Sequence, residues 1–292
     1  MPTYQPSFPW RCRWQTWQMV SSSRHYTPPR QGSPLLAEAN TVPIIVAMVR
    51  SLPRVYVNQP LAPGTRVTFT RDQAHYLRDV MRLGTDAAVA VFNGHDGEWR
   101  VGQLNLQRKA GSGIATEQIR TQSSASGPDL FFAPVKKTAT DFIVAKATEL
   151  GARALRPVMT EFTDTGRVNV ERLQINAREA AEQCGRLDIP QIGSPIGLRE
   201  LLGSWPLAQS LIIADETGDS DSAMKILNEI RVEDGPPAFV IGPQGGFSKT
   251  ELVFLRALPF VTTIDLGPRI LRAETAVVAA LTCWQATRGD WT

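Results

Sequence analysis

The rhythm of hydrophobic and polar positions changes close to residue 128. Before that point, short runs alternate apolar with polar residues and are separated by turn sequences such as Asn93-Gly94 and Asp96-Gly97, which is typical of half-buried strands in hairpins. After it, continuous apolar runs of strand length alternate with longer runs whose apolar residues recur at helical spacing. The first pattern predicts a small β-rich domain, and the second predicts an α/β domain with a parallel sheet.

Residues 52–120 are expected to form a small barrel-like domain closed by short strands. In the helix expected there, Ala74, Leu77, Val80 and Met81 fall on one face and predict its buried stripe. The elements expected in this part are strands over 54–58, 66–70, 88–92 and 98–104 and a helix over 72–81.

The second part carries the alternation of strands and helices. Gly151 follows the first of its helices and is expected to end it in the left-handed conformation. The composition of residues 122–128 (QSSASGP) is typical of a linker, so we expect domains over 48–121 and 129–292. The expected strands are 130–135, 154–160, 211–215, 238–241 and 260–266, and the expected helices are 138–150, 168–184 and 273–286.

Residues 1–47 differ in composition from the rest of the chain. They are rich in Pro, Ser, Trp, Gln and Arg, and Glu38 is their single acidic residue. This composition predicts disorder, and it also suits an organellar transit peptide. A third interpretation is an upstream start codon, because Met48 lies directly before the first expected strand. The apolar run Val42–Val49 is far too short to span a membrane, so no membrane partner is expected.

The net charge of +3 is unevenly distributed along the chain. Residues 1–47 carry four arginines against one acid, residues 48–127 carry ten basic and six acidic residues, and residues 128–292 carry 17 basic and 21 acidic residues. A polyanionic partner is therefore expected to meet residues 48–127 first. The alternative is that these charges form an ordinary solvated surface.

Cysteine and histidine usage argues against two kinds of site. Cys12, Cys184 and Cys283 lie far apart without a CxxC motif, which indicates a reducing compartment and no disulfide framework. The three histidines have no metal-ligand spacing, so no metal site is expected. We therefore expect a cytoplasmic protein.

A loop over residues 242–248 follows one of the apolar strands and holds two adjacent glycines, which permit positive φ and close approach of a ligand. Ser248 and Glu251 form a capping-box sequence, so a helix is expected to begin at the edge of this loop and its cap to occupy backbone amides. A P-loop Lys and a G-x-G-x-x-G fingerprint are both missing. These observations favour a neutral or zwitterionic adenosine-type ligand over a phosphate. The alternative is a tight turn without a ligand.

A second loop, over residues 266–276, makes an empty turn less plausible. Gly267-Pro268 stiffens it, and Arg269, Arg272 and Glu274 follow within six residues beside two aliphatic side chains. Arginines among aliphatic side chains need partners. The partner here is either Glu274, in a salt bridge, or an oxygen atom of a substrate.

Several stretches of the chain match the sequence pattern of one protein family, and they follow one another in the order found in that family. They are residues 54–57 and 75–82, residues 136–151, residues 182–186 (EQCGR), residues 241–251 (IGPQGGFSKTE) and residues 266–276 (LGPRILRAETA). Together they resemble the SPOUT class of RNA methyltransferases, and most closely the bacterial 16S rRNA uracil-N3 methyltransferases. This chain departs from the family pattern at Gln244, where Glu is expected, and in its N-terminal tail, which has no counterpart.

The resemblance implies a SPOUT-type parallel sheet whose C-terminal segment forms a trefoil knot, preceded by a PUA-like β-barrel. It implies a homodimer that binds S-adenosylmethionine through backbone groups of three loops and methylates uracil N3 in 16S rRNA of the small ribosomal subunit. Carried over to this chain, the residues expected to bind the cofactor are Asp215, Glu216, Ile241, Gly242, Pro243, Gly245, Gly246, Leu266, Gly267, Ile270, Leu271, Thr275 and Ala276.

The resemblance also suggests roles for charged residues. Removal of the N3 proton spreads negative charge over the uracil carbonyl oxygens, and Arg272 is our first choice to stabilise it, with a structural ion pair to Glu274 as the alternative. Glu274 is expected to act as the base or as a helix cap, and Cys184 to pack rather than to act as a nucleophile. The residues expected to contact RNA are Arg54, Arg78, Arg82, Arg186 (with the dimer contact as its alternative) and Arg269.

Two other functions compete with this interpretation. One is a SPOUT methyltransferase that acts on another RNA. The other is a non-catalytic RNA-binding factor in ribosome assembly, against which the intact Arg272 and both glycine loops argue.

Overall fold

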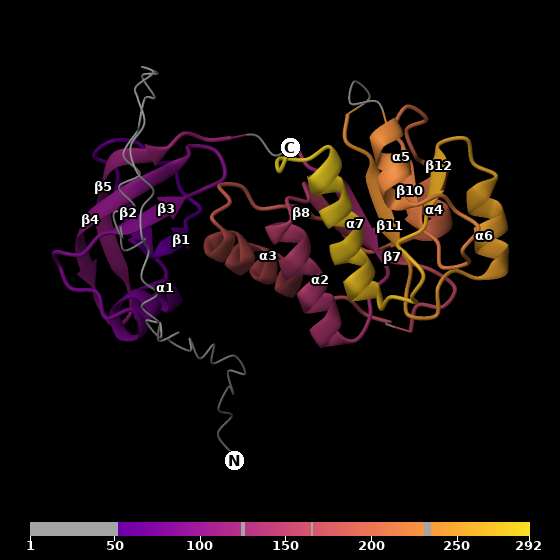
Figure 1. Cartoon of the computed structure of the whole chain (residues 1–292). Coiled ribbons are helices and arrows are strands. Elements are labelled where there is room, and N and C mark those ends of the chain that lie inside the picture. Colours follow the sequence, from indigo (N-terminus) through magenta and orange to yellow (C-terminus); the bar gives the residue numbers. More distant parts are fainter. Residues whose placement is uncertain (1–51, 124–125, 165, 231–234) are drawn as a thin grey trace, which may run out of the picture. The chain divides into compact units, whose positions relative to one another are not determined.

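The change of rhythm near residue 128 separates two β-sheets in the computed structural model of the chain (Figure 1). The predicted tail over 1–47, with Met48, and residues 124–125 of the predicted linker lie outside the described residues. Within the described part, no helix is long and apolar enough to cross a membrane. The residues that the structure describes are 52–123, 126–164, 166–230 and 235–292.

Five strands form the first sheet, in the order β1-β3-β4-β5-β2. β1 pairs with β3 in parallel, and all other neighbours are antiparallel. Val55 and Val67 are buried beneath it, as the alternation of apolar and polar residues predicts, and so are Val89, Val101 and Ala115. The strands are Arg54–Tyr56 (β1), Arg66–Phe69 (β2), Val89–Phe92 (β3), Glu98–Leu106 (β4) and Gly111–Arg120 (β5).

Strand β5 lies beyond the last strand expected in this part of the sequence. Its first residues are Gly111, Ser112 and Gly113, and glycine usually weakens a strand. A Cβ atom on Gly113 would lie 2.5 Å from Cγ1 of Val101 on the neighbouring strand. The glycine is therefore needed for the close approach of β4 and β5, and the same glycine hides the strand in the sequence.

The helix expected over 72–81 is wrong in its second half. The α-helix α1 spans Arg71–His75, and a π-helical turn follows over Tyr76–Val80. Ala74 and Leu77 are fully buried, but Val80 is 60% exposed and Met81 is 39% exposed. A π-helical turn uses i→i+5 hydrogen bonds and rotates the residues after it away from the α-helical stripe. The predicted stripe therefore ends at Leu77.

The second sheet is entirely parallel and confirms the predicted α/β fold. Its order is β12-β10-β11-β6-β7-β8, and β9 also pairs with β7. The strands are Asp129–Phe132 (β6), Ala154–Met159 (β7), Gln191–Ile192 (β8), Ile196–Gly197 (β9), Leu211–Ala214 (β10), Ala238–Ile241 (β11) and Val261–Ile264 (β12).

Helices cover both faces of the parallel sheet, with α2 and α7 on one side and α6 on the other (Figure 1). On β11, Phe239 and Ile241 pack towards the first side, and Ala238 and Val240 pack towards the second. Burial on both faces explains the continuous apolar runs of the sequence. Gly151 follows α2 with φ 80° and so adopts the expected left-handed conformation. The helices are Lys137–Glu149 (α2), Val170–Cys184 (α3), Leu198–Gly203 (α4), Ala223–Glu229 (α5), Lys249–Arg256 (α6) and Ala273–Thr287 (α7).

Candidate active site

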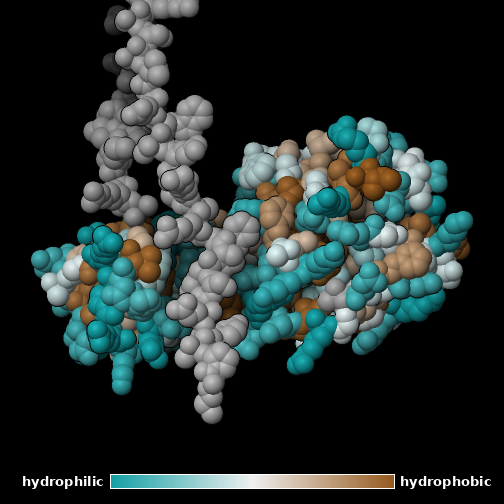
Figure 2. All heavy atoms as spheres, turned by 90° about the horizontal axis from the view of Figure 1, so that it is seen from below, coloured by the Kyte–Doolittle hydropathy of each residue, from teal (hydrophilic) through white to brown (hydrophobic). Residues whose placement is uncertain are grey.

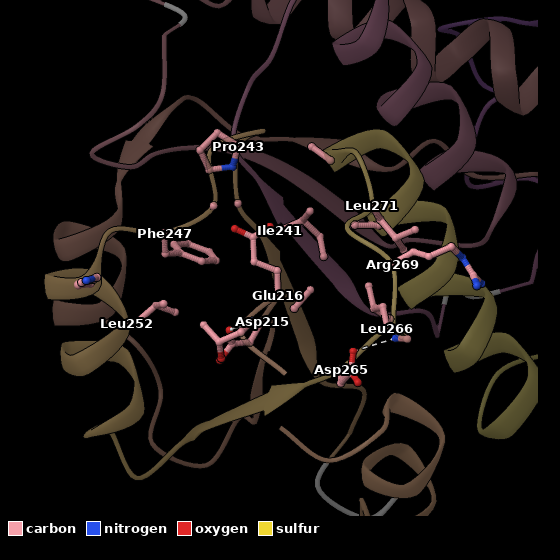
Figure 3. Close-up of a pocket in the computed structure, with 18 residues that line it drawn as sticks. Asp215, Glu216, Ile241, Pro243, Phe247, Leu252, Asp265, Leu266, Arg269 and Leu271 are labelled. Atoms are coloured by element: carbon pink, nitrogen blue, oxygen red, sulfur yellow. Dashed lines mark hydrogen bonds between the residues drawn. The ribbon is translucent and has the colours of Figure 1, made fainter. Parts of the chain in front are cut away.

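A cavity of about 230 Å³ opens at the carboxyl edge of the parallel sheet, where the neighbouring strands β10, β11 and β12 end (Figure 3). Its walls are the three loops that follow these strands, together with the starts of α6 and α7. This edge is where α/β proteins with parallel sheets bind their ligands. The cavity is lined by Ala214, Asp215, Glu216, Thr217, Ile241, Gly242, Pro243, Gly246, Phe247, Lys249, Leu252, Asp265, Leu266, Gly267, Arg269, Leu271, Ala273 and Ala276.

Glycines shape the wall that follows β11. A Cβ atom on Gly242 would lie 3.1 Å from the ring of Phe247, and one on Gly246 would lie 2.3 Å from a carboxylate oxygen of Glu216. Gly246 also has φ 69°, in the left-handed region. Its backbone nitrogen donates to the Pro243 carbonyl at 2.9 Å and closes the turn. These glycines allow the loop to fold tightly against the residues that line the cavity.

The capping box predicted for α6 is present. The Ser248 nitrogen donates to Glu251 Oε2 at 3.0 Å, and the Glu251 nitrogen donates to Ser248 Oγ at 3.1 Å. The second carboxylate oxygen of Glu251 accepts a hydrogen bond from the Glu161 nitrogen at 2.9 Å, so the loop after β7 is joined to the same helix start. Two of the backbone amides that could bind an anion here, those of Ser248 and Glu251, are occupied by the helix's own cap.

Asp215 is a buried carboxylate at the end of β10. It forms an ion pair with Arg256, and its Oδ1 accepts a hydrogen bond from the Thr217 nitrogen at 3.0 Å. Burial alone would raise the pKa of the Asp215 carboxyl, but the hydrogen bonds from Arg256 and Thr217 outweigh burial and lower the pKa below its ordinary value. Asp215 is therefore an ionised carboxylate with internal partners, which holds the loop after β10 in place.

The wall after β12 combines a turn with apolar side chains. Asp265 Oδ1 accepts a hydrogen bond from the Gly267 nitrogen at 2.8 Å, and Gly267 has φ 107° (Figure 3). Leu266 and Leu271 then line the cavity before α7 begins. The turn thus directs an apolar surface towards the glycine loop on the other side of the cavity.

Arg272 and Glu274 lie at the start of α7, next to the cavity. Arg272 is the N-cap residue of the helix and is exposed, and its guanidinium has no partner among the described residues. The salt bridge between Arg272 and Glu274, which was the structural alternative, is not formed. One carboxylate oxygen of Glu274, Oε2, is buried without a hydrogen-bond partner in the described part of the chain. The Arg272 guanidinium is therefore free to meet a ligand, whereas Glu274 Oε2 is buried, and neither residue lines the cavity itself.

Comparison with known families identifies the fold and its class. The RNA methyltransferase domain family matches residues 124–285, and the RNA methyltransferase PUA domain family matches residues 69–101. The chain belongs to the RNA methyltransferase family. Its C-terminal half therefore holds the methyltransferase domain, and its N-terminal half holds a PUA-like domain.

Individual relatives are similar to this methyltransferase over most of their length. The chain is 31% identical to the ribosomal RNA small subunit methyltransferase E of Rickettsia conorii over 78% of this chain and 93% of that protein. It is 30% identical to the protein of the same name from Synechocystis over 85% of each chain. The crystal structure of that methyltransferase from Neisseria gonorrhoeae, bound to S-adenosyl methionine, matches with a TM-score of 0.73 and 27% identity over 82% of this chain and 100% of that one.

Most of the residues expected to bind a cofactor line the cavity of this methyltransferase. Gly245, Ile270 and Thr275 do not line it, and Ile270 is 83% exposed. The predicted RNA contact Arg269 is itself on the cavity wall. Several lining residues were not predicted, and the signal that could have found Phe247, Lys249 and Leu252 is their position in the loop over 242–248 and in the first turn of the helix after it. The missed residues are Ala214, Thr217, Phe247, Lys249, Leu252, Asp265 and Ala273.

The arginines expected to contact RNA fall into three groups in this methyltransferase. The guanidinium groups of Arg54 and Arg186 form internal hydrogen bonds and ion pairs. We therefore assign both residues a structural role instead of the predicted RNA contact. Arg78 pairs with its neighbour Asp79 and keeps partial exposure. Arg82 and Arg269 are exposed and have no partner in the described part of the chain.

A metal site does not arise in the described residues. No group of three or more His, Cys, Asp or Glu side chains in that part of the chain is arranged to hold a metal ion.

Proposed function

We propose that this protein is an S-adenosylmethionine-dependent methyltransferase that modifies N3 of a uridine in 16S rRNA of the small ribosomal subunit. The observation that carries the proposal is the cavity beside Arg269 and Arg272, two arginines without partners among the described residues. An RNA offers the phosphate and carbonyl oxygens that free guanidinium groups bind. The names of the relatives from Rickettsia and Synechocystis support the choice of small-subunit rRNA.

The lining of the cavity fits S-adenosylmethionine. Leu266, Leu271 and Phe247 provide apolar walls, and Glu216 and Asp265 provide carboxylate acceptors for hydroxyl or ammonium groups. The backbone amides of Ser248 and Glu251 at the start of α6 are already capped, which disfavours a ligand with a phosphate at that point. When bound, the cofactor supplies a methyl group activated on a sulfonium sulfur. The bound cofactor in the Neisseria relative supports this assignment.

The residues at the start of α7 account for the chemistry that remains. Methyl transfer forms the bond between N3 and carbon while the bond between carbon and sulfur breaks, and the N3 proton leaves the uracil. We assign Arg272 to the uracil carbonyl oxygens, where negative charge collects as that proton leaves. Glu274 lies in the first turn of the same helix with an unpartnered carboxylate oxygen and is our candidate to accept the proton.

The proposal also includes the RNA contacts of the PUA-like domain and the homodimer. Arg82 and Arg78 contact the RNA backbone from the PUA-like domain, in the part of the chain with an excess of basic residues. Two copies form a homodimer in the cytoplasm, and the segment after β12 is threaded as a trefoil knot. Figure 2 shows hydrophobic residues exposed in several separate places on one face of the molecule, and scattered exposure of this kind does not by itself mark a contact surface.

Calorimetry and rRNA mapping test this function against its alternatives. We expect the purified protein to bind S-adenosylmethionine, and we expect 3-methyluridine to be lost from 16S rRNA in a strain without the gene. No binding at about millimolar cofactor, the upper end of ordinary enzyme affinities, would favour a non-catalytic RNA-binding factor. Binding together with unchanged 3-methyluridine in 16S rRNA would favour a methyltransferase for another RNA.

A further inference from the structure

The EQCGR motif, residues 182–186, contains the end of helix α3 and the residues that follow it. A helix leaves its last carbonyl groups without partners inside the helix, and these groups carry partial negative charge. Gly185 has φ 85° and turns the chain into the left-handed conformation at this point. The end of α3 therefore presents carbonyl oxygens that need hydrogen-bond donors.

Arg54 of β1 donates to two of these helix carbonyls and to a third carbonyl just beyond the helix. Its Nη1 donates to the carbonyl oxygens of Ala181 and Glu182, both at 2.8 Å, and its Nη2 donates to the carbonyl oxygen of Arg186 at 2.7 Å. The guanidinium also lies over the ring of Phe92, 4.6 Å from the ring centroid. The planar guanidinium of Arg54 is thus hydrogen-bonded at the end of a helix and is not a free surface charge.

Glu98 of β4 joins Arg54 to a second arginine. Glu98 Oε1 accepts from Arg54 Nε at 2.5 Å, and Glu98 Oε2 accepts from Arg120 Nε at 2.6 Å. Arg120 Nη2 in turn donates to the carbonyl oxygen of Gly185 at 2.8 Å. Only 5% of Glu98 is exposed, and both of its carboxylate oxygens are used. We refer to Arg54, Glu98 and Arg120 as the Glu98 clamp.

The end of α3 that receives the clamp is braced from its own side. Arg186 donates to the carbonyl oxygens of Thr148 and Ala152 at 2.8 and 2.9 Å. Glu182 Oε1 accepts from the Tyr56 backbone nitrogen at 2.8 Å, which adds a further bond between α3 and β1. The charged residues of the EQCGR motif therefore serve this contact, which explains why Arg186 has no guanidinium nitrogen directed towards a partner outside the protein.

We propose that Glu98 is a positioning residue for RNA methylation. Its clamp fixes the first sheet on the end of α3, so RNA bound by the PUA-like domain is presented to the cavity in one orientation. This inference rests on the proposed function. Orientation of reacting groups is a large part of catalysis, and a small misplacement is costly. Without the Glu98 charge, two arginines face each other with no buried counter-ion, and the contact loosens.

The test compares Glu98→Gln with Glu117→Gln in the full chain. Glu117 is a matched control because it lies on β5 of the same sheet, where its carboxylate is 69% exposed and 4.0 Å from Arg100. We expect Glu98→Gln to lower kcat/KM for small-subunit rRNA about 10- to 100-fold, with the affinity for S-adenosylmethionine unchanged. Glu117→Gln should behave as the wild type. Equal kcat/KM for the two folded variants would overturn the proposal.

A second variant separates positioning from folding. The Arg120 side chain is 45% exposed and forms the outer half of the clamp. Arg120→Gln removes this half and keeps the ion pair between Arg54 and Glu98. We expect a smaller fall in kcat/KM and a wider distribution of interdomain distances in small-angle X-ray scattering. If Glu98→Gln does not fold, an unchanged kcat/KM for Arg120→Gln overturns the proposal. If the wild type does not methylate rRNA, the proposed function fails instead, and identical scattering curves for Arg120→Gln and the wild type would still reject the clamp.

Discussion

At the scale of single residues, the neighbouring Gly245 and Gly246 of the glycine loop differ in whether the backbone requires a glycine. Gly246 has φ 69°, and a Cβ atom there would lie 2.3 Å from a Glu216 carboxylate oxygen. The nearest neighbour of a Cβ atom on Gly245 would be Phe162 at 3.7 Å, which is an ordinary contact. Gly245 also lacks a positive φ. Only the second glycine of the pair is therefore required by the backbone.

Gly246→Ala is expected to destabilise the fold by about 1–3 kcal/mol, because the new methyl group is strained and displaces Glu216. It should also weaken binding of S-adenosylmethionine at least about tenfold, which corresponds to about 1.4 kcal/mol. Gly245→Ala is the matched control and should change both quantities little. Chemical denaturation and calorimetry measure the two effects. Equal cofactor affinities in the two variants would contradict the assignment of this wall.

Arg272→Ala is expected to lower kcat roughly 10²- to 10³-fold, the usual effect of removing one donor to a developing negative charge. Affinity for S-adenosylmethionine should be nearly unchanged, because Arg272 does not line the cavity. Single-turnover kinetics and calorimetry separate these quantities. Arg269→Ala is the comparison, since Arg269 lies on the cavity wall. If Arg272→Ala loses rate and cofactor affinity equally, Arg272 is a binding residue.

At the scale of elements, the start of α6 joins helix stability to the cavity. Ser248→Ala and Ser222→Ala each remove the side-chain cap of a helix, and each should cost about 1 kcal/mol of the free energy of unfolding. Ser248 lies between the lining residues Phe247 and Lys249, so only Ser248→Ala should also weaken binding of S-adenosylmethionine. Thermal unfolding with and without cofactor measures both effects. The same cofactor-induced shift in both variants would show that the cap does not shape the cavity.

The elements with strong local signals could be predicted from the sequence. The strand Ala238–Ile241 and the start of α7 at Ala273 have the predicted bounds, because a continuous apolar run and an N-terminal turn sequence are local features. Strand β5 could not be predicted, since its glycines serve contact with β4. The π-helical turn over Tyr76–Val80 was hidden because its sequence also suits an α-helix.

The partners of the buried arginines could not be predicted either. Arg54 contacts the Ala181 carbonyl, 127 positions further along the chain, and its local pattern looks like that of an exposed strand residue. The glycine loops, by contrast, predicted a ligand site, and the family resemblance supplied most of the residues that line the cavity. Both are local features of the sequence, whereas a charged side chain that is satisfied by a distant carbonyl group leaves no local signal.

At the scale of the whole molecule, the cavity and the excess of basic residues belong to different halves of the chain. The cavity lies at the edge of the parallel sheet, and residues 48–127 carry ten basic and six acidic residues. Residues from 50 to 292 form one compact unit, and the Glu98 clamp is part of the contact within it. In the proposed function, the rRNA places its target base at the cavity and its phosphates against the basic residues of the first half.

The most direct test of the account uses small ribosomal subunits isolated from a strain that lacks this gene. The purified protein is incubated with these subunits and S-adenosylmethionine, and the 16S rRNA is mapped by mass spectrometry. We predict one added methyl group at N3 of a single uridine, and none with Arg272→Ala under the same conditions. A methyl group on another atom or base, or no methyl group with the wild-type protein, would contradict the proposed function.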